Sequence, residues 1–174
     1  MILSLFRKST ASASVFGVYS AIVAQSRRPV FYAEWGVPDT VTGRFDMISL
    51  HMALVFRRLR RENQETRDFS QAVFDLFFKD MDRSLREMGA GDLAVPKKIQ
   101  KMGTIFFGLL ASLAKAMDAG DRAGVADVLA RNVYEGPGPE AERLADYLMA
   151  EAEALEAQPV SEILAGNVRW REDA

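Results

Sequence analysis

The stretch from Phe45 to Arg61 predicts the helix around which this chain folds. Its apolar residues recur at three- and four-residue spacing and form one stripe: Phe45, Ile48, Met52, Val55, Phe56 and Leu59. In its first half, Met47, Leu50 and Leu54 make the other side apolar as well. A helix that is apolar on every side must be surrounded by protein. We therefore expect this helix to lie at the centre of the fold.

The rest of the chain shows the same helical period and no strand-like alternation. It predicts an all-α protein, a single compact domain of about six to seven helices. The expected helices span residues 9–25, 45–61, 65–88, 97–117, 121–133 and 140–156, with a short helical turn near 161–166. The expected divisions are residues 1–14 as an N-terminal extension or the start of the first helix, 15–157 as the helical domain and 158–174 as a C-terminal tail.

The N-terminal segment has two interpretations. Arg7 and Lys8, followed by an apolar run from Val15 to Ala24, are typical of a cleaved signal peptide. The run is short, however, and its apolar residues fall at helical spacing, which favours a helix packed on the core. The core helix is our prediction, and a cleaved or membrane-associated segment stays open as the alternative.

Between the first two long helices, glycines and prolines predict an ordered loop over residues 30–43. Phe31, Tyr32 and Trp35 are too apolar to be free in water, so we expect them to anchor this loop by burial. An exposed Trp35 that anchors a partner protein is the alternative interpretation.

His51 is the single histidine of the chain, and there is no cysteine. A helical metal site would need a second ligand three or four residues further on, where Leu54 and Val55 stand. No nucleophile elbow accompanies the histidine either. We therefore expect no enzyme activity, metal or cofactor, and we interpret His51 as a residue at the edge of the core. The alternative is a small α-helical haem- or cofactor-handling protein that uses His51.

Acidic residues in the string DLFFKDMDRSLRE could suggest paired carboxylates. Asp80 and Asp82 point to different sides of a helix, so they cannot share a proton or an ion. We expect surface ion pairs at four-residue spacing instead: Asp75–Lys79, Asp82–Arg86 and Arg83–Glu87.

Basic residues gather at three helix ends although the net charge of -2 argues against a dedicated nucleic-acid binder. The groups are Arg27 and Arg28; Arg57, Arg58, Arg60 and Arg61; and Lys97, Lys98 and Lys101. If these ends were neighbours, they would form a patch suited to RNA-containing particles or anionic lipid. The alternative is ordinary surface charge balanced by nearby glutamates.

Three segments closely resemble the ubiquinol–cytochrome c chaperone family in a bacterial form: FYAEWGVPDTVTGRFDMISLHMALVFRRL, DMDRSLREMGAGDLAVPKKIQKMG and LARNVYEG. The resemblance runs from about residue 15 to 155. It implies a helical, non-enzymatic assembly factor of complex III that binds newly made cytochrome b or another complex III subunit. Mitochondrial members of the family, with a small partner protein, also bind the ribosome near the tunnel exit. Ribosome contact and peripheral association with the inner membrane, for an otherwise cytoplasmic protein, stay open for this chain.

The chain departs from the family pattern after KKIQKMG, where Leu109 takes the place of an arginine. The helix is therefore more apolar, which indicates either deeper burial or an apolar partner-binding face. With methionines on this helix and the preceding one, we expect a groove between them that accepts a client helix, with the lysines at one end. The candidate partner-binding residues are Arg27, Arg28, Tyr32, Trp35, Arg57, Arg58, Arg60, Arg61, Lys97, Lys98, Lys101, Ile105 and Leu109.

Overall fold

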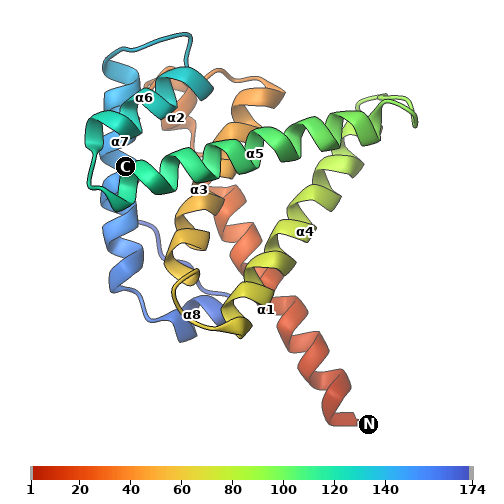
Figure 1. Cartoon of the computed structure of the whole chain (residues 1–174). Coiled ribbons are helices and arrows are strands. Elements are labelled where there is room, and N and C mark those ends of the chain that lie inside the picture. The colour runs from red at the N-terminus through yellow and green to blue at the C-terminus, as the bar shows by residue number, and fades with distance from the viewer. Residues whose placement is uncertain (1, 173–174) are drawn as a thin grey trace.

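The computed structural model describes residues 2–172 of the chain, and the side chains of residues 12–172 (Figure 1). In this part of the chain every regular element is an α-helix, which confirms the all-α prediction. The helices are α1 (Ile2–Ser26), α2 (Pro29–Ala33), α3 (Val41–Leu59), α4 (Gln64–Glu87), α5 (Val95–Asp118), α6 (Arg122–Asn132), α7 (Pro139–Ala157) and α8 (Val160–Leu164). Among the described helices, none is long and apolar enough to cross a membrane.

Helix α3 lies at the centre, as its apolar circumference predicts, and packs against α1, α4, α5 and α7. Its start is set by the sequence around Thr40, whose side chain accepts a hydrogen bond from the Gly43 backbone nitrogen over 3.1 Å. A Cβ atom at Gly43 would collide with the carbonyl oxygen of Pro38, so only glycine fits this first turn. The core extends beyond α3, α4 and α5, because α1, α6 and α7 add buried residues.

Helices α4 and α5 form a long hairpin whose connecting turn projects away from the body (Figure 1). Asn63 and Thr66 make a reciprocal capping box at the start of α4. Gly89, with a φ of 85°, lies just beyond its end. Pro96 occupies the first turn of α5, where a missing N–H costs nothing. Asp121 caps α6, its side chain accepting from the Gly124 backbone nitrogen over 2.8 Å, so this helix begins where the sequence analysis placed it.

Two segments are more ordered than the sequence suggested. Residues 29–33 form the short helix α2 where we expected only a loop, and the loop is anchored by the buried Phe31, as predicted. At the other end of the chain, α8 buries Ile163, and the Trp170 indole N–H donates to the carbonyl of Ala21 over 3.2 Å. The segment that follows α7 thus packs against α1 and contributes to the core.

Helix α1 begins at Ile2, seven residues before the expected start at residue 9. Val18, Tyr19 and Ile22 are buried, so this part of the N-terminal segment is a core-packing helix. The predicted ion pairs Asp82–Arg86 and Arg83–Glu87 are both present at 2.7 Å. Asp75 differs from the prediction, because it accepts a hydrogen bond from Gln71 over 2.7 Å.

Candidate functional site

His51 lies inside the core, not at its edge as expected, and both of its ring nitrogens are hydrogen-bonded. Nδ1 is 2.7 Å from the carbonyl oxygen of Met47, and because a carbonyl can only accept, Nδ1 carries the proton. Nε2 is therefore the acceptor for the Tyr147 hydroxyl at 2.7 Å. That hydroxyl in turn accepts from Gln25 Nε2 at 3.0 Å, and Ser26 Oγ lies 3.1 Å from Nδ1.

This network makes His51 a structural residue that joins α1, α3 and α7. Burial lowers the pKa of His51 to about 4, and the hydrogen bond to Met47 opposes that shift only in part. The imidazole is therefore neutral at physiological pH. No ring nitrogen is free to bind a haem iron, so the geometry gives no support to the haem-handling alternative. Within the described residues, no group of acidic or histidine side chains could hold a metal ion.

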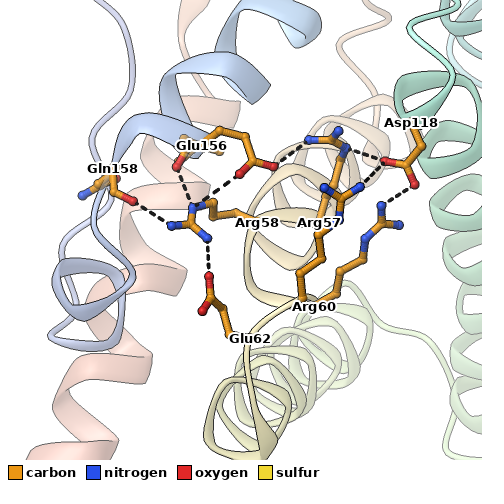
Figure 2. A network of polar contacts seen from close by, with 9 residues as sticks. Arg57, Arg58, Arg60, Glu62, Asp118, Glu156 and Gln158 are labelled. Carbon is orange, nitrogen blue, oxygen red and sulfur yellow. Dashed lines mark hydrogen bonds and ion pairs between the residues drawn. The ribbon is translucent and has the colours of Figure 1, made fainter.

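The arginines at the end of α3 are ion-paired rather than free (Figure 2). Asp118, at the end of α5, receives Arg57 at 3.1 Å, Arg60 in a closer contact and Arg61 at 3.7 Å. The Arg60 hydrogen bond is the main reason that the pKa of Asp118 lies below its usual value. Arg57 also reaches Glu156 of α7 at 3.2 Å. The cluster therefore joins the C-terminal ends of three helices.

Arg58 binds backbone carbonyl groups at the end of α7. Its guanidinium donates to the carbonyl oxygens of Leu155 at 3.0 Å and Gln158 at 3.2 Å, beside the end of α7. A helix C-terminus carries unpaired carbonyls and partial negative charge, so a cation there is stabilising. Glu62, four residues along the chain, completes the arrangement at 2.8 Å. The side chain is largely buried by these contacts.

The lysines of α5 and the arginines of α3 do not form one patch. Lys97, Lys98 and Lys101 begin α5, whereas the arginines of α3 contact Asp118 at the other end of that helix. From Lys101 to Asp118 the helix rises about 25 Å, so the two groups lie far apart. The interpretation of the arginines as balanced charge is supported, although the carboxylates that balance them are mainly Asp118 and Glu156.

Arg27 and Arg28 follow the end of α1 and have different surroundings. Arg27 and Tyr32 line a hollow of about 620 Å³ together with the ion pair Arg44–Asp39. Arg28 is half-buried and interacts electrostatically with Glu151 of α7. Tyr32 donates its hydroxyl to the Ser26 carbonyl at 2.8 Å, which fixes the turn between α1 and α2.

An apolar groove lies between α3, α4 and α5, and its floor and walls are aromatic. It consists of two adjoining hollows of about 200 and 300 Å³ that share Phe56, Arg60, Phe107 and Leu110. Phe107 is 56% exposed, although its ring lies only 5.3 Å from the ring of Phe74. Phe106, beneath it, is fully buried and 5.5 Å from both rings. A rigid cluster of rings thus holds an exposed aromatic surface in place.

The rim of this groove is basic. Arg60 lies on both hollows and is held by Asp118. The guanidinium of Arg67, on the α4 side, donates to Gln64 Oε1 at 2.9 and 3.2 Å and makes no ion pair in the described structure. The expected lysines lie near the hairpin turn instead, so the charge beside the groove comes from arginine.

The structure decides between the alternatives for two further candidates, Trp35 and Leu109, and places a third, Ile105. Trp35 is 5% exposed and packs against Phe31 at 5.1 Å, with the Arg143 guanidinium 4.7 Å from the centre of its ring, which confirms the predicted burial over the surface-anchor alternative. Leu109 is 2% exposed, so of its two alternatives the structure supports deeper burial. Ile105 is on the surface but lines neither hollow.

The groove residues Phe56, Phe74, Phe107 and Leu110 were not among the candidates. The one signal was the doublet Phe106–Phe107, because two adjacent residues of a helix point about 100° apart and cannot both face the same core. The contribution of Phe74 required knowing how α4 and α5 pack.

Comparison with known proteins agrees with this architecture. The family model described as ubiquinol-cytochrome C chaperone matches residues 33–170. The crystal structure of the Cbp3 homolog from Brucella abortus is 38% identical, covers 99% of this chain and 97% of that chain, and has a TM-score of 0.88. No curated protein matches the chain significantly. The chain belongs to the ubiquinol–cytochrome c chaperone family.

Proposed function

We propose that this protein is an assembly chaperone of ubiquinol–cytochrome c reductase and that the groove between α3, α4 and α5 binds an apolar segment of newly made cytochrome b. Family membership supports the assembly role. The observation that carries the binding site is Phe107, a large aromatic side chain that is 56% exposed above a buried ring cluster. Exposed apolar surface of this kind, with a charged rim, is typical of a site for another protein.

The geometry suits a helical client. Groove-binding helices insert residues at three- and four-residue spacing between the helices of the receptor. Here the two hollows adjoin at Phe107 and Leu110, which line both of them, so they offer neighbouring receptacles for such side chains. Arg60 and Arg67 stand beside the groove, where they complement a polar or acidic end of an otherwise apolar helix.

Reversible binding follows from the same features. The rings of the groove are ordered before the client arrives, because Phe74 and Phe106 contact one another at 5.5 Å and Arg60 is fixed by Asp118. A preorganised site loses little conformational entropy on binding. The groove is small, so the client is released once tighter contacts within its own complex become available. This mechanism requires neither catalysis nor a cofactor.

Affinity purification from detergent-solubilised membranes tests this proposal. We expect complex III subunits, and cytochrome b among them, to co-purify with the wild type and to be lost with Phe107→Asp. Val41→Asp is the matched control, because Val41 is 53% exposed on the first turn of α3, far along the chain from the groove. An acidic residue in a first helical turn is also favourable, so the control folds.

Two results would contradict the proposal in different ways. If no complex III subunit accompanies the wild type, the assembly role is wrong. If Phe107→Asp retains as much cytochrome b as Val41→Asp, the role stands and the groove is not the site. Circular dichroism of both variants checks that the fold is intact.

A further inference from the structure

The turn between α4 and α5 is the part of the hairpin that projects farthest from the body (Figure 1). We call residues 82–101 the hairpin tip. Leu93 is 90% exposed and Met88 is 56% exposed, whereas Leu85 and Val95, just behind them, are buried between the two helices. The tip is thus a folded, packed structure that presents two aliphatic side chains to its surroundings.

The charge of the hairpin tip is positive although the whole chain has a net charge of -2. Its three carboxylates are engaged by two arginines: Asp82 and Asp92 contact Arg86 at 2.7 and 2.5 Å, and Glu87 contacts Arg83 at 2.7 Å. Lys97, Lys98 and Lys101 are exposed, and in the described structure none of them has an ion-pair partner. With five basic and three acidic residues, the tip has a net charge of +2, and its three unpaired ammonium groups lie on the first two turns of α5, which follow the exposed Leu93.

We propose that the hairpin tip docks onto an anionic lipid surface, with Leu93 and Met88 entering the headgroup region and Lys97, Lys98 and Lys101 contacting the phosphates. Aliphatic side chains flanked by lysines are the combination that interfacial segments use. Each lysine near an anionic membrane contributes about 1 kcal/mol, which corresponds to roughly a fivefold gain in partitioning. RNA would be attracted by the same lysines, but it gains nothing from a 90% exposed leucine.

Docking of the hairpin tip would also set the distance between the groove and the lipid surface. Phe107 lies twelve residues beyond Val95, the first residue of α5, so the helix places it at most about 20 Å from the lipid surface. The proposal does not depend on the identity of the client, because it rests on the tip alone. Its test uses purified protein and vesicles, without cytochrome b.

The absence of cysteine from the chain allows a direct test. Leu93→Cys carries a single environment-sensitive fluorophore, and Ser112→Cys, on an exposed part of α5 far from the tip, is the matched control. We expect phosphatidylglycerol vesicles to cause a blue shift and a rise in emission at position 93 but not at position 112. Phosphatidylcholine vesicles should have little effect at either position. Equal responses at both positions, or none at position 93, would overturn the proposal.

Variants of the three lysines and of Leu93 distinguish binding to lipid from binding to RNA. Changing Lys97, Lys98 and Lys101 together to Gln should lower vesicle binding by roughly a hundredfold, the product of three fivefold steps. Lys115→Gln removes one exposed charge at the other end of α5 and should have little effect. Leu93→Gln should weaken vesicle binding, and Val41→Gln should not. If polyuridylate binds more tightly than phosphatidylglycerol and Leu93→Gln leaves both unchanged, the tip is an RNA contact and the lipid proposal is wrong.

Discussion

Replacing Tyr147 by phenylalanine should destabilise the protein by about 2–4 kcal/mol, because one hydroxyl completes the buried network around His51. That hydroxyl donates to His51 Nε2 over 2.7 Å and accepts from Gln25 over 3.0 Å. Without it, the His51 ring nitrogen and the Gln25 amide N–H lose a partner in a buried site. Each unsatisfied buried group costs about 1–3 kcal/mol, and the sum is reduced because the hydroxyl itself no longer has to be desolvated.

Urea unfolding followed by circular dichroism measures this loss, and a chain of this size should also melt roughly 5–15 °C lower. Tyr134→Phe is the matched control, because its hydroxyl makes one hydrogen bond, to the Trp35 carbonyl at 2.9 Å, in a half-buried position. We expect the control to lose about 1 kcal/mol. If Tyr147→Phe costs no more than the control, the network does not stabilise the fold as described.

Three further changes test other parts of the structure. Phe77→Ala, at a fully buried position, should cost about 3–5 kcal/mol in urea melts, and a loss below about 1 kcal/mol would contradict its place in the core. Burial raises the pKa of Asp46 to about 7 from 3.8, so the folded state keeps a proton that the unfolded chain releases. The wild type should therefore lose stability relative to Asp46→Asn as pH rises from 4 through 7, by up to about 4 kcal/mol above pH 8. A difference in unfolding free energy between the two proteins that does not change with pH would refute this. Arg58→Ala should cost about 1.5–3 kcal/mol, because it removes the hydrogen bonds to the carbonyls of Leu155 and Gln158. Arg61 is exposed and has one long ion pair, so the control Arg61→Ala should cost about 0.5 kcal/mol or less. Equal losses from the two variants would contradict the role of Arg58 at the end of α7.

The helices were largely predictable because their signals are local. The apolar circumference of α3 identified the central element, and Asp121 marked the start of α6. Helix α2 was missed because five residues are too few to show a period or to be stable alone. The position of Trp170 could not be predicted, since its partner, the Ala21 carbonyl, is 149 residues away in the sequence.

The candidate site was predicted less well because its contacts are non-local. The arginine run after Phe56 suggested free positive charge, but Asp118 and Glu156 are 61 and 99 residues from Arg57, and no local pattern connects them. The expectation of an apolar groove beside α4 and α5 placed the right helices together. Which side chains line it depended on the rotation of each helix, which buries Leu109 and exposes Phe107.

Site-specific photo-crosslinking to newly made cytochrome b tests the central claim most directly. A photoreactive amino acid is placed at Phe107 or Ala111, on the groove side of α5, and at Glu153, an exposed position on α7. The groove model predicts cytochrome b adducts from positions 107 and 111 and none from position 153. Adducts from position 153 without any from α5 would place the client on another face and contradict the model.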